Sequence, residues 1–260
     1  MFKRIARGHF TRVELQRYLM VMAGGFWGTI LLAWLSYPAE HHYSIMSHTF
    51  SFLGSYNEEH NPAWWWIFSV AMFSWAVAML PLVQYHYRRF AVVSRWAARV
   101  GAFFLLVGSL GTALVALFPD VHGELAGMRI TDIHTKAALL VAAGYVLAIL
   151  WHAGIFLVDR FTHRRGQFRL RRLVWPYLLW SGMVAMAAYN QITWDIKYRA
   201  MKEEAARTGA SIRSSWGESL NTIYAFPLWE NLVIYTLFIF LIWFALAVPH
   251  DTAAPHRETK

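Results

Sequence analysis

Long apolar runs alternate with shorter polar segments along this chain. Each run has about the 20 residues that a helix needs to cross a bilayer, and charged residues occur in them only near the start of two, as Lys136 and Glu230. The pattern predicts an all-α membrane protein, a six-transmembrane-helix bundle that forms one domain over residues 1–260. The six spans are expected at residues 18–37, 64–84, 100–118, 135–158, 173–190 and 228–248.

Two of the predicted spans carry a signal beyond their length. The third is rich in small residues, among them Gly101, Gly108 and Gly111, which let neighbouring helices pack closely. The fifth leads into the sequence WDIKYRAMKEEAARTG, which is typical of a helix that continues outside the membrane and breaks at Gly209. An extended outer loop, residues 191–227, is therefore expected between the fifth and sixth spans.

The distribution of basic residues predicts which way the bundle faces. With the N-terminus in the cytoplasm, 17 of the 24 Lys and Arg residues fall on cytoplasmic segments, in agreement with the positive-inside rule. We therefore expect both termini to be cytoplasmic and the protein to lie in a bacterial-type inner membrane. The outer side then carries three segments, residues 38–62, 119–134 and 191–227.

Composition narrows the classes of function. Hydrophobic residues make up 57% of the chain and aromatic residues 17%, which is far from the balance of a soluble domain. The net charge of +9 comes from segments between apolar runs. We interpret it as a determinant of topology and of binding to anionic lipids, and not as a nucleic-acid surface. The chain has no cysteine, which excludes disulfides, thiolate metal sites and iron–sulfur clusters.

The first outer segment is unusually polar for a connection between membrane helices. Residues 38–62 hold four of the twelve histidines and no Lys or Arg. On a helix, Ser44, Ser47, His48 and Ser51 would share one face, because their spacing is i, i+3, i+4 and i+7. Such a face either closes the end of a bundle or lines a site.

Serine, aspartate and histidine side chains on the outer segments suggest a site for lipid chemistry. We predict Ser47, Asp120 and His134 as catalytic residues, with Ser47 orienting the substrate or stabilising an oxyanion. Histidine and carboxylate donors suit zinc, whose open position would activate water against a lipid ester or amide. The candidate zinc ligands are His48, Asp120, His122 and His134.

Structural explanations compete with this hypothesis. No HxxxH or HExxH pair places two ligands on one helix, and histidines in outer loops are often simply solvated. Asp132 and Ser44 have the positions of helix caps. Glu230 is explained equally well as a buried acid near an outer cavity or as a first-turn glutamate stabilised by the helix dipole.

His152 lies within the fourth predicted span, where an ionisable residue is a functional candidate by default. It could serve as an axial haem ligand, and His86 at the inner end of the second span is the nearest second histidine. The alternative is a neutral histidine bonded to a nearby serine or backbone carbonyl. The sequence favours this structural role over haem.

Part of the chain resembles a known family. The segment YSIMSHTFSFLGSYNEEHNPAWWWIFSVAMF is similar to the signature of uncharacterised six-span bacterial membrane proteins that share a domain of unknown function. The resemblance includes a glycine-rich third span that ends in Phe-Pro-x-Asp-like residues, and a histidine that opens the fourth. The matching positions are Ser47, Ser51, Leu53, Gly54, Asn61, Pro62, Phe118, Pro119, Asp120 and His134.

The chain is also similar, more distantly, to the Frag/DRAM/Sfk group of eukaryotic membrane proteins, which is linked to lipid-anchor remodelling and lysosomal membranes. The resemblance covers residues 43–150 and implies a fold and a polar outer cluster, but no particular reaction. A looser likeness joins Ser47, Asp120 and His134 to membrane hydrolases of the alkaline-ceramidase and adiponectin-receptor type. The paired-histidine motif of those enzymes is missing here.

The leading hypothesis is therefore an inner-membrane protein with a polar, outward-facing Ser/Asp/His pocket that acts as a metal-assisted lipid hydrolase or acyl-transfer enzyme. The alternative is a non-enzymatic subunit or scaffold whose outer loops bind a lipid headgroup or a protein partner. A haem-bearing electron-transfer subunit that uses His152 is the weakest of the three. Membrane lipids are the expected partners, and nucleic acid is not.

Overall fold

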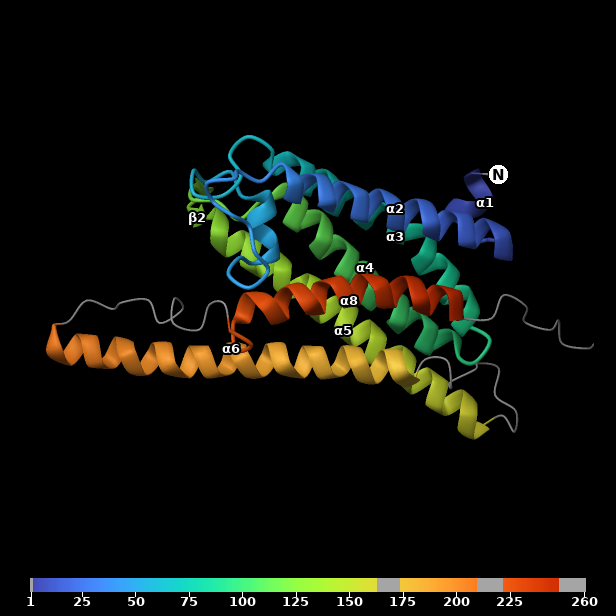
Figure 1. Cartoon of the computed structure of the whole chain (residues 1–260). Coiled ribbons are helices and arrows are strands. Elements are labelled where there is room, and N and C mark those ends of the chain that lie inside the picture. The colour runs from blue at the N-terminus through green and yellow to red at the C-terminus, as the bar shows by residue number, and fades with distance from the viewer. Residues whose placement is uncertain (1, 163–173, 210–221, 248–260) are drawn as a thin grey trace, which may run out of the picture.

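Figure 1 shows the computed structural model of the chain, which describes residues 2–162, 174–209 and 222–247. These residues are largely helical, so the predicted all-α class is confirmed. The long helices are α2 (Arg12–Leu35), α3 (Trp65–Phe90), α4 (Arg95–Leu117), α5 (Ile130–Thr162), α6 (Val174–Thr208) and α8 (Phe226–Ala247). The short elements are helix α1 (Phe2–Ala6), the 3-10 helix η1 (Phe50–Gly54) and the antiparallel strands β1 (Glu124–Leu125) and β2 (Met128–Arg129).

Five of these helices, α2, α3, α4, α5 and α8, are long and apolar enough to cross a membrane. They correspond to all the predicted spans except the fifth. That span falls in α6, which is not among the candidates within the described part of the chain. Composition explains the difference, because tryptophan, tyrosine, proline, serine and asparagine in residues 174–190 lower the mean hydropathy of α6. Over the described residues, the structure therefore supports five candidate spans, and the fifth of the six predicted spans is not confirmed.

α6 is a single helix of 35 residues, so the predicted continuation of this segment as a helix is confirmed. Its first half packs on α8, where the rings of Tyr177 and Trp180 lie 4.9 and 5.9 Å from that of Phe240. Its second half extends past the ends of the other helices (Figure 1). The helix ends, as predicted, before Gly209, whose φ of +69° favours glycine.

Helices α4 and α5 cross at close range through small residues. A Cβ atom added at Gly144 of α5 would lie 2.2 Å from the backbone nitrogen of Gly108 in α4. One added at Gly111 would lie 2.6 Å from the backbone nitrogen of Val141. The predicted role of glycines in the third span is confirmed, because a larger side chain would not fit between the two backbones.

Aromatic side chains join α8 to the first two spans. Phe26 of α2, Trp75 of α3 and Phe238 of α8 are buried, and their ring centroids lie 4.9, 4.4 and 4.3 Å apart in pairs. Rings at these separations attract each other beyond the effect of burial alone. The last helix thus returns to pack against the start of the chain and closes the bundle.

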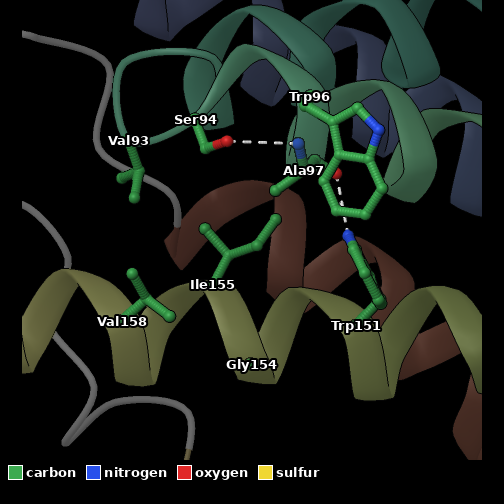
Figure 2. Close-up of a pocket in the computed structure, with 8 residues that line it drawn as sticks. All are labelled: Val93, Ser94, Trp96, Ala97, Trp151, Gly154, Ile155 and Val158. Carbon is green, nitrogen blue, oxygen red and sulfur yellow. Dashed lines mark hydrogen bonds between the residues drawn. The ribbon is translucent and has the colours of Figure 1, made fainter.

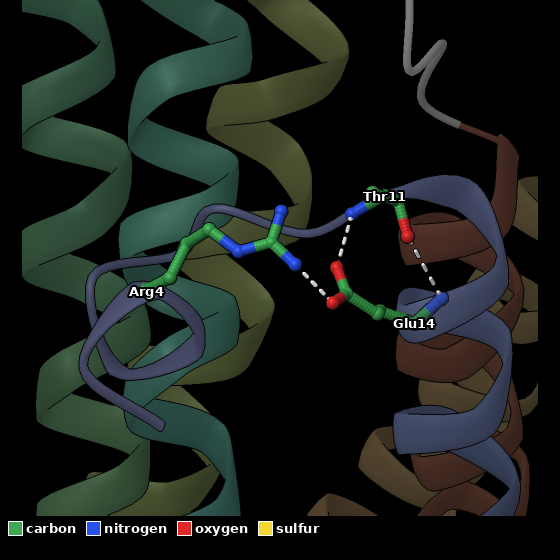
Figure 3. Close-up of polar contacts among 3 residues, drawn as sticks. All are labelled: Arg4, Thr11 and Glu14. Carbon is green, nitrogen blue, oxygen red and sulfur yellow. Dashed lines mark hydrogen bonds and ion pairs between the residues drawn. The ribbon is translucent and has the colours of Figure 1, made fainter. Parts of the chain in front are cut away.

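The N-terminus is fixed by a capping box at the start of α2 (Figure 3). The backbone N–H of Thr11 donates to Glu14 Oε2 at 2.8 Å, and the backbone N–H of Glu14 donates to Thr11 Oγ1 at 3.2 Å. The guanidinium of Arg4 pairs with the other oxygen of Glu14. Because Arg88 also donates to the carbonyl of Arg7 at 2.9 Å, the chain before α2 is tied to both α2 and α3.

The connecting segments gather at two opposite ends of the bundle (Figure 1). The segment between α2 and α3, the strands β1 and β2, and the start of α8 lie at one end, which we call the loop end. The start of the chain, the turn between α3 and α4, and the end of α5 lie at the other, which we call the basic end. Its arginines include Arg4, Arg7, Arg88, Arg89, Arg95, Arg99 and Arg160. The arginine-rich segment 163–172 lies outside the described residues.

The first outer segment differs from the helix that its spacing suggested. Residues 45–48 form turns, with backbone N–H groups of Ser47 and His48 both bonded to the carbonyl of Ser44. The short 3-10 helix η1 follows after Thr49. Ser44, Ser47, His48 and Ser51 therefore do not form one helical face, because the chain must fold back over the end of the bundle within a short distance.

Candidate functional site

The segment between α2 and α3 is packed against the bundle at the loop end. In η1, Phe50 and Leu53 are buried, and the ring of Phe68 fills the space where a Cβ at Gly54 would lie. The buried side chain of Asn61 donates to the carbonyl of Leu53 at 3.1 Å. These contacts give the polar side chains of the segment fixed positions.

Asn231 of α8 connects this segment to the last helix. Its side-chain nitrogen donates to the backbone carbonyls of His48 at 2.9 Å and Pro227 at 2.8 Å, and its oxygen accepts from the hydroxyl of Tyr43 at 3.1 Å. Asn231 is fully buried. Burial raises the pKa of Tyr43, so that hydroxyl stays a protonated donor. Asn231 thus fixes the backbone directly beside Ser47.

Ser47 and His48 form a hydroxyl–imidazole pair. Ser47 Oγ lies 2.8 Å from His48 Nδ1, and both residues are half-buried. The backbone N–H of Ser44 points at the same ring nitrogen from 3.4 Å. Burial lowers the pKa of His48, so the ring is neutral near pH 7 and its Nδ1 can accept a proton. A hydroxyl beside such a base is the arrangement that activates a serine nucleophile.

Aromatic residues surround His48 and a second histidine, His60. Ring centroids of Tyr37, Tyr43 and Phe52 lie 6.0, 5.6 and 5.9 Å from that of His48. The ring of Phe52 also stacks on His60 at 3.9 Å, and His60 Nδ1 lies 3.3 Å from the hydroxyl of Tyr37. Burial lowers the pKa of His60 as well. Both imidazoles are therefore held in place and neutral near pH 7.

Asp120, which follows α4, belongs to a neighbouring polar group. Its Oδ2 accepts a long hydrogen bond from Ser51 Oγ at 3.4 Å, and Ser51 Oγ lies 3.0 Å from Thr49 Oγ1. Glu230, which follows the first turn of α8, is near enough to interact electrostatically with Asp120, and among the described residues its buried Oε2 has no hydrogen-bond partner. The pKa of His60 also responds to Asp120. Carboxyl groups and hydroxyls in one neighbourhood suit a ligand that forms hydrogen bonds.

His134 and His122 have partners of their own. His134 is buried at the start of α5, and its Nδ1–H donates to the carbonyl of Phe118 at 2.7 Å. This bond satisfies an acceptor at the end of α4. His122 is exposed, with Nε2 3.6 Å from a carboxylate oxygen of Glu59, and its backbone N–H donates to Asn57 Oδ1 at 3.1 Å. Each of the two histidines thus has a structural role.

The predicted zinc ligands are divided among these contacts. His48 pairs with Ser47, Asp120 with Ser51, and His134 with the end of α4. Across residues 2–162, 174–209 and 222–247, no three His, Asp or Glu side chains are grouped so that they could hold a metal ion. The structure gives the zinc hypothesis no support. The Ser47–His48 pair is the part of the predicted chemistry with a direct contact.

Several residues of this end carried no usable signal in the sequence. Tyr37 and Tyr43 follow an apolar run, where tyrosine is common at the membrane interface. His60 stands in the histidine-rich segment, but no spacing links it to Asp120. Asn231 and His48 are 183 residues apart, so only the packing of α8 against the first segment reveals their bond.

A second pair of histidines lies inside the bundle. His86 of α3 and His152 of α5 are each 1% exposed, and their ring centroids are 6.1 Å apart. His152 Nδ1–H donates to the carbonyl of Ala148 at 2.6 Å, as the structural alternative predicted. Among the described residues, its Nε2 and both ring nitrogens of His86 have no hydrogen-bond partner.

The surroundings of this pair do not suit haem. The ring of Phe244 lies 5.0 Å from that of His86 and 5.4 Å from that of His152, and Phe90 lies 4.4 Å from His152. A haem ligated by both histidines would extend its flat macrocycle through the space that these rings fill. The described residues therefore form a packed core here.

Comparisons with known proteins do not add a family to these observations. No family model matches the chain, and no curated protein or solved structure is significantly similar to it. The resemblances to six-span bacterial membrane proteins and to the Frag/DRAM/Sfk group stay predictions.

Proposed function

We propose that this chain is a multi-pass protein of a bacterial-type inner membrane, with both termini in the cytoplasm. Five apolar helices support insertion in a membrane. The charge distribution supports the orientation, because arginines gather at the basic end while Glu40, Glu58, Glu59 and Asp120 belong to segments of the loop end. Basic residues next to spans favour the cytoplasmic side.

Cysteine accessibility tests this orientation. The chain has no cysteine, so Glu58→Cys at the loop end and Val92→Cys at the basic end each introduce a single thiol at an exposed position. In intact spheroplasts, a membrane-impermeant maleimide is expected to label Glu58→Cys at once and Val92→Cys only after permeabilisation. The reverse pattern would place the loop end in the cytoplasm.

The loop end is a site for a membrane lipid, on which the protein acts as a hydrolase or acyl-transfer enzyme. The observation that carries this proposal is the contact of 2.8 Å between Ser47 Oγ and the neutral, half-buried imidazole of His48. The carboxylate of Asp120, with Ser51, supplies acceptors for a hydroxyl or ammonium of the lipid headgroup. Asp120 is thus assigned to substrate binding.

The reaction uses only groups of this pair and the substrate. Ser47 Oγ attacks the carbonyl carbon of a lipid ester while its proton passes to His48 Nδ1. The same proton then moves from His48 to the departing alcohol oxygen, which leaves an acyl group on Ser47. Water, or the hydroxyl of a second lipid, takes the acyl group in the reverse sequence of proton transfers and restores the serine.

Covalent labelling and product analysis test this reaction. A fluorophosphonate probe is expected to label Ser47 in the full-length protein, and lipid vesicles are expected to release fatty acid or acylated product. Ser47→Ala should abolish labelling, and His48→Gln should lower turnover by about 100-fold or more, since a general base contributes about 10²–10⁴-fold. The matched control is Ser36→Ala, because Ser36 Oγ donates only to the carbonyl of Ala33 at 3.1 Å.

Two results would contradict this assignment. Equal labelling of Ser47→Ala and the parent would place the nucleophile elsewhere, and full activity of His48→Gln would remove the base. The zinc-assisted form with His48, Asp120, His122 and His134 stays a sequence-based hypothesis. Metal analysis of the purified protein tests that form separately.

A non-enzymatic role is the second candidate. It is favoured by the structural bonds of the predicted site residues, above all His134 to Phe118 and Asp120 to Ser51. On this alternative the loop end binds a lipid headgroup or a protein partner without turnover. A parent protein that retains lipid but releases no product, with unchanged retention in Ser47→Ala, would favour it.

A further inference from the structure

A groove of about 380 Å³ opens between the start of α4 and the last turns of α5 (Figure 2). It lies at the basic end, far along both helices from the Ser47–His48 pair. Tryptophan rings at one end of the groove, those of Trp96 and Trp151, pack edge to face with centroids 5.6 Å apart. The main lining residues are Val93, Trp96, Trp151, Gly154, Ile155 and Val158.

The walls of this groove are apolar in effect. The hydroxyl of Ser94 already accepts the backbone N–H of Ala97 at 3.3 Å. The indole N–H of Trp151 already donates to the carbonyl of Ala97 at 2.8 Å (Figure 2). Both polar side chains are thus engaged, Ser94 in capping α4 and Trp151 in joining α5 to α4. The surface that remains for an occupant consists of carbon atoms. An occupant must therefore be a hydrocarbon.

Gly154 is the reason that the groove is open. A Cβ atom added there would meet no heavy atom within 4 Å, whereas one added at Gly144, further up the same helix, would collide with α4. The α5 surface is therefore indented beside Ile155 and Val158. A larger side chain at this position would enter the groove and leave the helix contacts unchanged.

Basic side chains lie beside the groove on α4. Arg95 is next to Trp96 in the sequence, and Arg99 is one turn further along the same helix. Both are exposed, and the part of the chain that the structure describes gives neither of them an ion pair or hydrogen bond. An arginine guanidinium matches a phosphate in geometry as well as charge. An apolar groove thus lies beside arginines that have no ion-pair partner among the described residues.

We infer that this groove binds one acyl chain of an anionic phospholipid, whose phosphate is held by Arg95 and Arg99. Its size argues against a helix of a partner protein, because a helix with its side chains is about 10–12 Å wide and would not enter a space of about 380 Å³. A single hydrocarbon chain is narrow enough. The neighbouring cations select a negative headgroup over a zwitterionic one.

Native mass spectrometry of the full-length protein tests the apolar part of this site. The purified protein is titrated with phosphatidylglycerol and, separately, with phosphatidylcholine. Gly154→Leu fills the groove and is expected to lower binding of phosphatidylglycerol by about tenfold or more, since several CH₂ groups of the acyl chain lose their burial. The matched control is Gly28→Leu on α2, another exposed helix glycine whose Cβ would meet nothing within 4 Å.

The arginines are tested by a second matched pair. Arg95→Gln with Arg99→Gln is expected to lower the preference for phosphatidylglycerol over phosphatidylcholine by about tenfold, since each arginine attracts the anionic headgroup. The control is Arg12→Gln with Arg17→Gln, which removes the same charge from exposed positions of α2 near the same end. It is expected to leave the preference unchanged.

Each contrary result overturns a defined part of the inference. Equal binding by Gly154→Leu and Gly28→Leu would show that the groove holds no chain. Equal effects of the two arginine pairs would show that the net charge of the protein attracts the lipid, and that Arg95 and Arg99 form no specific site. If the parent protein bound phosphatidylglycerol and phosphatidylcholine equally, the proposal that the lipid is anionic would be wrong. None of these outcomes depends on the chemistry at Ser47.

Discussion

Replacement of Gly144 by alanine is expected to destabilise the bundle by about 3 kcal/mol, the upper part of the range for overpacked cores. The added methyl group would lie 2.2 Å from the backbone nitrogen of Gly108 and 2.9 Å from the carbonyl oxygen of Phe104. Backbone atoms cannot move aside as a flexible side chain can. The two helices must separate, and the packing of α4 on α5 is lost along its length. Thermal unfolding of the protein in detergent measures the effect.

Gly154→Ala provides the matched control on the same helix. Its Cβ meets nothing within 4 Å, and alanine favours a helix over glycine by up to about 1 kcal/mol. The two variants make the same chemical change and should shift the midpoint of unfolding in opposite directions. Similar midpoints for Gly144→Ala and Gly154→Ala would show that the backbones of α4 and α5 do not touch at Gly144 and Gly108.

Asn231→Leu is expected to loosen the loop end and to lower stability by about 2–4 kcal/mol. Leucine has a similar size but leaves the carbonyl of His48 without the donor it has at 2.9 Å. The hydroxyl of Tyr43 loses its bond of 3.1 Å to Asn231 and keeps a longer one, of 3.4 Å, to the carbonyl of Thr49. A buried polar group that loses its partner costs about 1–3 kcal/mol. Unfolding midpoints and the rate of proteolysis within residues 36–64 measure the two parts of the effect.

Asn190→Leu is the control for this prediction. Asn190 is also buried, at 5% exposed, but its side chain donates only to the carbonyl of Met186 in the preceding turn of its own helix, at 2.9 Å. The substitution should lower the free energy of unfolding by less than about 1 kcal/mol, because that carbonyl keeps its place in the helix. If both variants lowered the midpoint equally, Asn231 would have no special role in holding the first segment.

The difference between these two asparagines shows where sequence reasoning stops. Both occur at the ends of apolar runs, and nothing in their neighbours separates them. Only the position of α8 beside the first outer segment gives Asn231 its partners. The same holds for His86 and His152, whose closeness was an open question in the sequence and is a ring separation of 6.1 Å in the structure.

The candidate site was predictable in part. The polar outer segments and the Ser47–His48 neighbours follow from the order of residues. The proposed grouping of His48, Asp120, His122 and His134 does not appear among the described residues, because each side chain found a nearer partner. Local bonds such as that from His134 to the carbonyl of Phe118 satisfy helix ends first.

The sequence by itself determined that this is a helical protein with long apolar helices, that glycines of the third run permit close packing, and that basic residues gather on one set of connections. Hydropathy, residue size and charge are properties of the chain before it folds, so they can be read in order along it. The tertiary structure alone decided which polar residues meet at the loop end, and that Gly154 leaves a groove where Gly144 leaves none. These depend on which helix faces which, and that is set by packing between residues far apart in the chain.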